Sequence, residues 1–488
     1  MNNIFDKLKN YSDSDYYAFH MPGHKRNMGK WGFADPYRID ITEIDGFDDL
    51  HHAEGILRDA QERAARVYHA DETHFLVNGS TVGILSAILG TTEKGDSILV
   101  ARNCHKSVYH AIYLNELDPV YLYPKFDTEQ GLSTEIDAAD VQKALEEHPK
   151  IRAVMIVSPT YDGVVSDIEK IAEIVHAKGC PLIVDEAHGA HFGFDPYFPK
   201  SANIYGADLV INSLHKTLPA LTQTALLHVN GDMVKRRKVK QYLDMLQTSS
   251  PSYILMASID ACIGMLEETL ETHSDARSDY KYKNIFSEYA NRIEALRKDL
   301  KRLKYLKIIQ TDNTDRYDRS KFVISVKHAP MSSHELYEIL LHRYHLQMEM
   351  LAGTYVLAMT TVGDTQEGLD RLRDALLEID KEIDTKQGRP AAIETDLPLS
   401  GRQPALEKVW TIAEAVNRRD KIQKRSFEDS IGCISVEYAY LYPPGSPLIV
   451  PGERITKEAV EILHWYQEHD FSIEGLQSED GIEVWIDG

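Results

Sequence analysis

The stretch Ile151-Arg-Ala-Val-Met-Ile-Val157 is an apolar run of strand length, and Pro181-Leu-Ile-Val184 is a second one. Between them, apolar side chains recur at helical spacing, at Ile168, Ile171, Ile174 and Val175. Ser166-Asp-Ile-Glu169 predicts a capping box at the start of this helix, and Gly179 marks its end. A strand, a helix and a second strand in this order predict two parallel strands of one sheet, joined by a helix that covers one face.

The same alternation continues on both sides of this unit. Residues 54–68 predict a helix, and residues 75–88 predict a strand end, a turn of small residues and an apolar helix. Further strands are predicted at residues 97–101, 209–211 and 224–229. Strands that alternate with helices predict an α/β fold whose mainly parallel sheet is covered on both faces.

Around residue 275 the pattern changes to long charged helices such as residues 289–303, with strands predicted at residues 322–326 and 355–359. The last part contains a predicted strand at residues 434–440 and a proline-rich loop at residues 441–453. We therefore expect five parts: an N-terminal arm and helix (1–70), a large cofactor-binding domain (71–275), a small α+β domain (276–383), a polar linker (384–405) and a C-terminal α+β domain (406–488).

The composition excludes several classes of protein. The chain has 488 residues and a formal charge of −22, which argues against binding to nucleic-acid phosphates. This charge fits a cationic ligand or simple solubility, of which the second is the commoner explanation. Four cysteines without a CxxC pair predict reduced thiols in a cytoplasmic protein. No apolar stretch approaches the roughly 20 residues that span a bilayer, so no membrane association is expected.

Polar residues follow the ends of most predicted strands, where parallel sheets bind their ligands. They are Asn78, Gly79, Ser80, Thr81, His105, Thr160, Asp185, His188, Ser213, His215 and Lys216. Gly79, Ser80 and Thr81 fall at a helix N-terminus, where backbone N–H groups and hydroxyls either bind a phosphate or simply cap the helix.

Lys216 lies between two predicted buried strands, where burial disfavours the ammonium form. A desolvated lysine can form a Schiff base with a carbonyl, including that of pyridoxal phosphate (PLP). The alternative is a surface lysine in a loop. The shared edge with Asp185 and His105 favours the reactive lysine.

Two other clusters could also be functional. His51 and His52 have no second pair at ligand spacing, so no metal site is predicted there. The cluster Phe19-His-Met-Pro-Gly-His-Lys-Arg-Asn27 either lines a site or forms an exposed arm.

Short motifs run through nearly the whole chain, and each is weak alone. They are Phe19-His-Met-Pro-Gly-His-Lys25, Asp48-Asp-Leu-His51, Asn78-Gly-Ser-Thr81, Asn103-Cys-His-Lys106, Ser158-Pro-Thr-Tyr161, Val184-Asp-Glu-Ala-His-Gly189, Ser213-Leu-His-Lys216, Leu221-Thr-Gln223, Tyr442-Pro-Pro-Gly445 and Pro451-Gly-Glu453. Together and in this order, they closely resemble the bacterial ornithine/lysine/arginine decarboxylases, PLP-dependent enzymes of fold type I. The chain resembles the short form typical of biosynthetic arginine decarboxylases.

This resemblance implies an aspartate-aminotransferase-like fold and the decarboxylation of a cationic amino acid. Arginine, converted to agmatine for polyamine biosynthesis, is the expected substrate, and lysine and ornithine are the alternatives. Another fold-type-I activity such as an aminotransferase, or a catalytically silent scaffold, is the remaining reading. The resemblance also implies a homodimer or higher homo-oligomer with sites at the interface, to which Asp48, Asp49 or His51 contribute.

The resemblance assigns a role to each polar residue at the sheet edge. Lys216 forms the Schiff base, Asp185 pairs with the pyridine nitrogen, and His105 stacks on the cofactor ring. The phosphate contacts are Gly79, Ser80, Thr81, Ser213 and His215. His188 lies near the ring oxygen or the substrate carboxylate, and Thr160 lines the ring. Lys216 or a nearby histidine then protonates Cα.

The residues that bind the distal end of the substrate, far from Lys216, are less clearly indicated by the sequence. Glu437 precedes the Tyr-Pro-Pro-Gly motif and is expected to bind the distal cation of the substrate, because a guanidinium prefers a bidentate carboxylate. The alternative is a solvated carboxylate on a strand. Ser446 departs from the branched apolar residue of many family members, which leaves the substrate open but not the reaction class.

Overall fold

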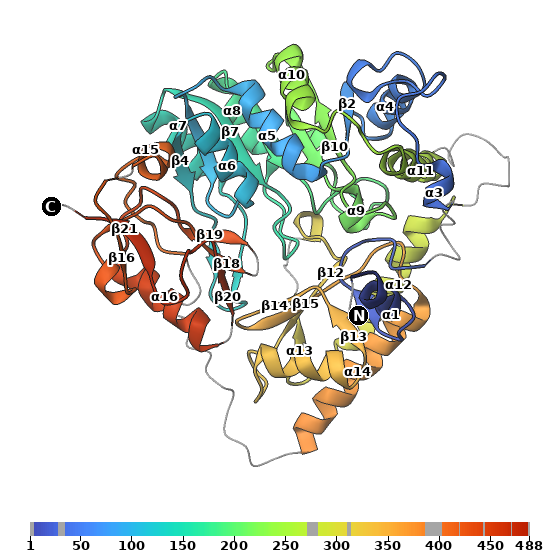
Figure 1. The fold of residues 1–488 in the computed structure, drawn as a ribbon. Coiled ribbons are helices and arrows are strands. Elements are labelled where there is room, and N and C mark those ends of the chain that lie inside the picture. The colour runs from blue at the N-terminus through green and yellow to red at the C-terminus, as the bar shows by residue number, and fades with distance from the viewer. Residues whose placement is uncertain are drawn as a thin grey trace.

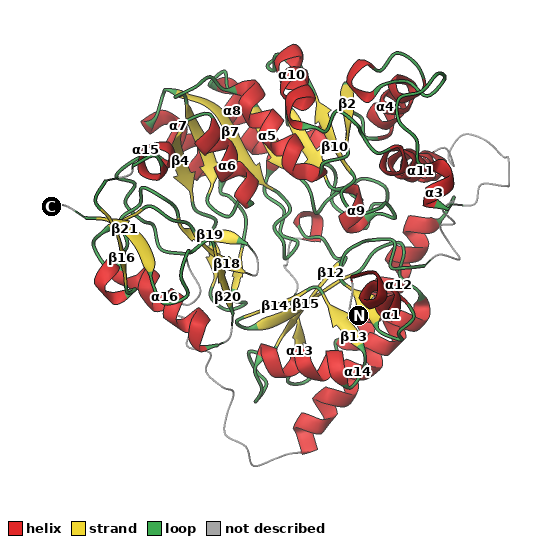
Figure 2. Ribbon diagram, viewed as in Figure 1, coloured by secondary structure: helices red, strands yellow, loops and turns green. Residues whose placement is uncertain are grey.

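The computed structural model describes residues 4–27, 35–270, 282–309, 314–385, 403–418, 420–442, 445–469 and 471–486. Three units pack together in Figure 1: a large unit at the top, a small unit below it and a C-terminal unit at the left. Figure 2 shows that each unit combines strands with helices that pack on them. The predicted linker, residues 384–405, falls mostly outside the described residues.

The large unit is built on one seven-stranded sheet. In spatial order, its strands are β2 (Glu72–Leu76), β10 (Ala225–Val229), β9 (Leu209–Asn212), β8 (Leu182–Asp185), β7 (Ile151–Val157), β3 (Ser97–Ala101) and β4 (Asp118–Leu122). β9, β8, β7, β3 and β4 pair in parallel, whereas β10 is antiparallel to both of its neighbours. The prediction of a mainly parallel α/β sheet is therefore confirmed.

Helices cover this sheet and bury its strands. The helices are α4 (Ile56–Val67), α5 (Gly79–Thr91), α6 (Lys106–Leu114), α7 (Ala138–Glu147), α8 (Ile168–Ala177), α10 (Arg236–Leu246) and α11 (Tyr253–Leu270). α5 packs against α6 and α10, and α7 packs against α8. β8, β9 and β10 are buried along their whole length, as expected for strands with helices on both faces.

The predicted capping box of α8 is wrong by one position. Asp167 is the N-cap, and its side chain accepts a hydrogen bond from the backbone N–H of Lys170. The Ser166 hydroxyl instead accepts from the backbone N–H of Ile136, so it ties the helix start to a neighbouring loop. Asp and Ser are equally good N-caps, and the tertiary contact decides between them.

The small unit is a four-stranded antiparallel sheet with helices against it. Its elements are α12 (Ile285–Leu300), β11 (Lys307–Ile308), β12 (Lys321–Ser325), α13 (Ser333–His342), β14 (Met350–Ala352), β15 (Tyr355–Met359) and α14 (Gln366–Thr385). The N-terminal segment (residues 4–27) belongs to it, because β1 (Tyr17–Phe19) pairs in parallel with β13 (Leu346–Met348). Figure 1 places the N-terminus beside this unit.

The C-terminal unit carries two three-stranded sheets. Its elements are α15 (Ile412–Val416), β16 (Ile422–Arg425), β17 (Ile434–Ser435), β18 (Ala439–Tyr442), β19 (Ser446–Ile449), α16 (Lys457–Glu468), β20 (Ser472–Glu474) and β21 (Ile482–Trp485). The strand predicted at residues 434–440 is in fact two strands in different sheets, separated by a bend. The predicted loop at residues 441–453 contains β19, an edge strand that tolerates Pro447 because only one side is paired.

A buried ion pair joins this unit to the large one. Arg102, just after β3, donates to the Glu453 carboxylate at 3.0 Å, and both side chains are 1% exposed. Arg102 also donates to the backbone carbonyls of Pro447 and Leu448 at 2.6 and 3.2 Å. The Pro-Gly-Glu motif therefore fastens the C-terminal unit to the edge of the large sheet.

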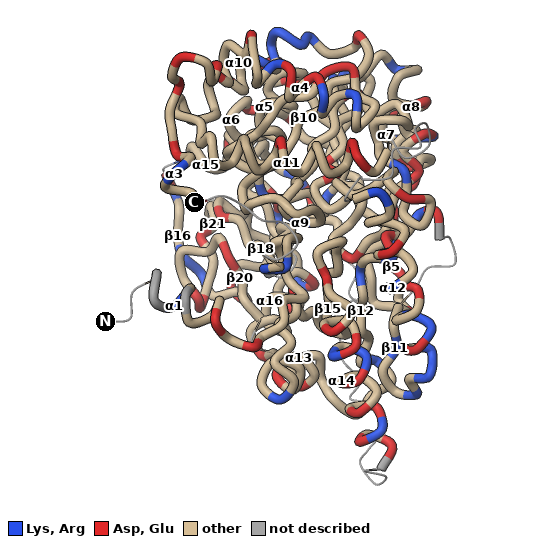
Figure 3. The backbone as a smooth tube through the Cα atoms, turned by 90° about the vertical axis from the view of Figure 1, so that its right-hand side faces the viewer, with Lys and Arg blue, Asp and Glu red and all other residues tan. Residues whose placement is uncertain are grey.

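Charged residues of both signs are interspersed along the surface elements, as Figure 3 shows for α14. Within the described part of the chain, no helix is both long enough and apolar enough to cross a bilayer.

Candidate active site

The order of the strands explains why residues far apart in sequence meet. β9, β8, β7 and β3 are successive parallel neighbours, so their carboxyl ends lie along one edge of the sheet. Lys216 follows β9, Asp185 ends β8, Thr160 follows β7 and His105 follows β3. β2 runs in the same direction as β9, since β10 is antiparallel to both, and this brings Gly79 to the same edge.

Lys216 lies in the single turn α9 (Leu214–Thr217), and its Nζ is 3.0 Å from Nε2 of His188. Burial lowers the pKa of Lys216 below its usual value, and the nearby Asp185 carboxylate partly offsets this. A larger share of the free amine is therefore present at neutral pH than on an exposed lysine.

Asp185 is buried, and its Oδ1 accepts a hydrogen bond from the backbone N–H of Ala187 at 3.0 Å. Burial raises the pKa of Asp185, whereas the charge of Lys216 lowers it. A buried carboxylate at the end of a central strand is a suitable partner for a protonated ring nitrogen, which it holds in the charged form.

Two hydroxyls meet at the start of α5, where Ser80 Oγ and Ser213 Oγ are hydrogen bonded to each other. Gly79 has a φ of +73°, and its N–H donates to the carbonyl of Gln223 at 2.9 Å. Nδ1 of His215 lies 2.9 Å from the carbonyl of Thr224. These contacts bring Ser80, Ser213 and His215 around a helix N-terminus, which favours an anion.

His105 is the N-cap of α6, and its Nδ1 accepts from the backbone N–H of Ser107. Its ring is open to the cavity. The cavity walls desolvate the ring and lower the pKa of His105 to about 4, and the charge of Lys216 acts in the same direction. The imidazole is therefore neutral at pH 7, as a ring that stacks on an aromatic cofactor should be.

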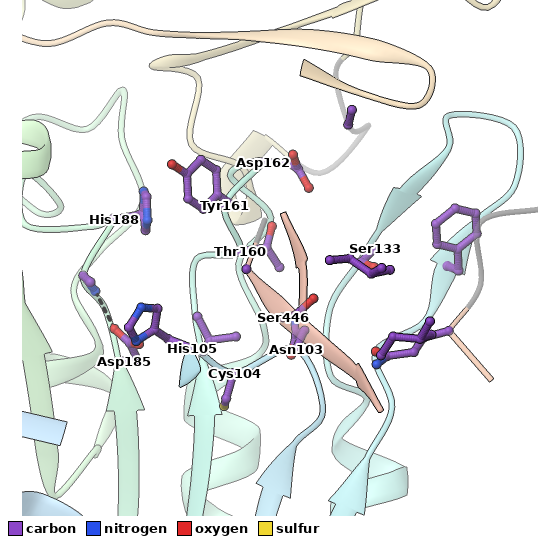
Figure 4. Close-up of a pocket in the computed structure, with 18 of the residues that line it drawn as sticks. Asn103, Cys104, His105, Ser133, Thr160, Tyr161, Asp162, Asp185, His188 and Ser446 are labelled. Atoms are coloured by element: carbon purple, nitrogen blue, oxygen red, sulfur yellow. Dashed lines mark hydrogen bonds between the residues drawn. The ribbon is translucent and has the colours of Figure 1, made fainter. Parts of the chain in front are cut away.

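These residues line one cavity of about 600 Å³, a volume typical of small-molecule sites. Every residue predicted to contact the cofactor lies in its wall, namely Gly79, Ser80, Thr81, His105, Thr160, Asp185, His188, Ser213, His215 and Lys216. Figure 4 shows His105, Asp185 and His188 on one side, with Ser133 and Ser446 opposite. Ser446 is also a wall residue of this cavity.

Glu437, which was predicted to bind the distal cation of the substrate, is the one predicted site residue outside the cavity wall. Its carboxylate accepts the backbone N–H groups of Gln477 at 2.9 Å and Glu483 at 2.8 Å. It sits at the bend between β17 and β18 and belongs to neither strand. Asp48 caps backbone N–H groups of residues 54–57, and His51 contacts Asp244.

The sequence assigned no role to three further wall residues, Tyr161, Asp162 and Tyr355. Tyr161 lies against His188 with ring centroids 4.5 Å apart, and its hydroxyl donates to Glu349. Asp162 and Tyr355 share a hydrogen bond at the far end. Asp162 stood in the sequence directly after the quoted motif, whereas Tyr355 and Glu349 come from the small unit and carried no signal.

The residues present fit PLP. The site offers a lysine of lowered pKa, a buried carboxylate, a neutral imidazole open to the cavity and a helix N-terminus with two hydroxyls. The fold and the site together define a PLP-dependent enzyme of fold type I.

The comparisons with known proteins identify the family. The Orn/Lys/Arg decarboxylase major domain matches residues 2–337, and the C-terminal domain of the same family matches residues 402–484. The chain is 31% identical to an arginine decarboxylase of Bacillus subtilis strain 168 over 94% of its own length and 92% of that protein. It is 36% identical to the uncharacterized protein YaaO of the same organism, over 94% of its own length and 93% of that protein.

Among solved structures, the lysine decarboxylase LdcF of Francisella novicida superposes with a TM-score of 0.78 at 18% identity, covering 98% of this chain and 80% of that one. This likeness supports the fold. The chain belongs to the Orn/Lys/Arg decarboxylase family. It is a PLP-dependent decarboxylase of basic amino acids, which confirms the resemblance found in the sequence.

Proposed function

We propose that this enzyme decarboxylates L-arginine to agmatine. The observation that carries the proposal is the similarity to arginine decarboxylases over nearly the full length of both chains. The bond from Cα to the carboxylate breaks, carbon dioxide leaves, and Cα takes up one proton, so no oxidant is needed. Bound PLP supplies the electron sink that stores the bonding pair until the proton arrives.

In this proposal Lys216 holds the cofactor covalently and Asp185 pairs with its pyridine nitrogen. The lowered pKa of Lys216 supports its role, because only the free amine is a nucleophile. The buried position of Asp185 supports its own, since a carboxylate without competing water interacts strongly with a cationic ring.

The start of α5 and the turn α9 would hold the phosphate. Gly79 begins the helix, and Ser80, Thr81 and Ser213 offer hydroxyls, with the His215 ring beside them. His105 and Thr160 also line the cavity, where His105 would stack on the cofactor ring and Thr160 would lie beside it.

His188 is the residue best placed to move a proton. Its Nε2 is 3.0 Å from Lys216 Nζ, and burial lowers its pKa well below the usual value, so the ring is neutral and can accept a proton. Lys216 or His188 then delivers the proton to Cα.

The test is a substrate panel with the PLP-loaded enzyme. Arginine, lysine and ornithine are supplied separately, and carbon dioxide and the amine product are both measured. The highest kcat/KM for arginine, with agmatine as product, supports the proposal. A higher kcat/KM for lysine or ornithine would refute the substrate, and keto-acid formation without carbon dioxide would point to transamination.

We further propose that the enzyme acts in the cytoplasm as a homodimer or higher homo-oligomer that serves polyamine biosynthesis. The buried, unpaired cysteines Cys104, Cys180 and Cys262 support a reducing compartment. Sedimentation of the PLP-loaded enzyme at several concentrations measures the assembly, and a persistent monomer that is fully active would contradict it.

A further inference from the structure

The carboxylates of the cavity wall are few. Among the described residues that line the cavity, Asp162 and Asp185 are the only acids. Asp185 ends the central strand β8 and is already assigned to the pyridine nitrogen of the cofactor. The substrate of a basic amino acid decarboxylase carries a second cation at the far end of its side chain, and burying a cation without a partner costs several kcal/mol. Asp162 is therefore the wall residue left to meet that cation.

Asp162 is held rigidly. Tyr355 donates its hydroxyl to Asp162 Oδ1 at 2.5 Å. The backbone on either side is a tight turn, in which Thr160 N–H donates to the carbonyl of Val164 and Gly163 N–H donates to that of Thr160. The other hydrogen bond to the carboxylate comes from the backbone N–H of Asp162 itself, so no other side chain donates a hydrogen bond to it among the described residues.

The position of Asp162 suits the distal end of a substrate. Figure 4 shows Asp162 beyond Thr160 as seen from Asp185 and His105, with Ser133 and Ser446 on the neighbouring wall. Its side chain is only 8% exposed, so water screens its charge weakly. Burial raises the pKa of Asp162 to about 6, and a bound cation favours the ionised form.

Two lysines of this chain lie in the same region. Lys321 is fully buried, its Nζ lies 4.0 Å from Asp318 Oδ2 without a hydrogen-bond partner among the described residues, and its charge lowers the pKa of Asp162. Lys327, a wall residue, donates to the carbonyls of Thr128 and Glu129 at 2.8 Å each. Neither ammonium forms an ion pair with Asp162 within 4.0 Å among the described residues.

We propose that Asp162 is the specificity residue that binds the distal cationic group, guanidinium or ammonium, of the amino acid substrate, with Tyr355 orienting its carboxylate. This rests on the proposed function, because it presupposes a decarboxylase acting on a basic amino acid. It replaces Glu437, which the fold directs away from the cavity.

The decisive variant is Asp162→Asn, which keeps the size of the side chain and removes the charge. KM for arginine is expected to rise at least about 10-fold, because removing one partner of a buried charge pair is costly. The discrimination between arginine and citrulline, a neutral analogue of similar shape, should fall by a similar factor. PLP absorbance and the melting temperature of the holoenzyme should stay close to those of the wild type, which shows that the variant folds.

Two further variants sharpen the test. Asp162→Glu retains the charge and should keep the preference for arginine over citrulline, even if its longer side chain raises KM. Glu173→Gln removes an exposed carboxylate on α8 and should leave all kinetic constants unchanged. If Asp162→Asn has the wild-type KM and the wild-type preference for arginine, the inference is wrong while the proposed function stands. A wild-type enzyme that decarboxylates none of arginine, lysine and ornithine overturns both.

Discussion

His188 Nε2 lies 3.0 Å from Lys216 Nζ, and the other ring nitrogen of His188 has no hydrogen-bond partner among the described residues. A buried imidazole with one engaged and one open nitrogen can accept a proton from the lysine and later return it. We expect His188→Gln to lower kcat about 100-fold, within the range typical of general acid–base catalysis, while PLP absorbance persists. Single-turnover measurement of carbon dioxide release separates this effect from product release, and an unchanged chemical step would contradict the role.

Lys216→Ala removes the only side chain proposed to hold the cofactor covalently. The variant should lose the long-wavelength absorbance of the holoenzyme and its turnover. A matched control is Lys170→Ala, an exposed lysine on α8. Retention of the wild-type spectrum by Lys216→Ala would mean that another amine carries the cofactor.

His228 links pH to stability. Its Nδ1 lies 2.8 Å from Thr73 Oγ1 and its Nε2 lies 3.0 Å from Asn212 Oδ1, and burial lowers its pKa to about 3. The unfolded chain binds a proton near pH 6.5 and the folded chain does not, so stability falls as pH drops below 6.5. The titration of His228 alone should lower the free energy of unfolding by about 2 kcal/mol between neutral pH and pH 5.

Chemical denaturation of wild type and His228→Gln at pH 7 and pH 5 measures this contribution. The loss of unfolding free energy between the two pH values should be smaller in the variant. Equal losses in both proteins would show that other groups cause the acid sensitivity.

Glu453→Ala should lower the unfolding free energy by about 3–5 kcal/mol, because it leaves Arg102 charged and unpaired in a buried site. The double variant Arg102→Met with Glu453→Leu should recover much of that loss, since no charge is left to desolvate. Equal melting temperatures for Glu453→Ala and the wild type would indicate that water reaches the pair.

Ser446→Val adds apolar volume to the wall opposite His105. A few methyl groups in a pocket shift selectivity by about 10-fold to 200-fold. We expect KM for arginine to rise more than KM for ornithine, whose side chain is shorter. A parallel change for both substrates would place Ser446 outside the part of the cavity that senses side-chain length.

Much of the fold follows from the sequence because the strands of the large sheet are short apolar runs with clear ends. The strand at Ser97–Ala101 was predicted with its observed bounds, and the residues after each strand end do meet in one cavity. Glu437 was misplaced because a bend between β17 and β18 interrupts residues 434–440, whose sequence contains no glycine or proline to mark it. Tyr355 and Glu349 were missed because their contacts to Asp162 and Tyr161 span well over a hundred residues.

The N-terminal segment makes its contacts with a late part of the chain. Gly23 N–H donates to the carbonyl of His215 at 2.7 Å, its own carbonyl accepts from Thr361, and Lys25 Nζ donates to the carbonyl of Met359, 334 residues away. At ribosomal speeds of about 5–20 residues per second, roughly 15–70 s separate the synthesis of Lys25 from that of Met359. These contacts of the N-terminal segment, which also binds the loop that bears Lys216, can therefore form completely only after Met359 has been synthesised.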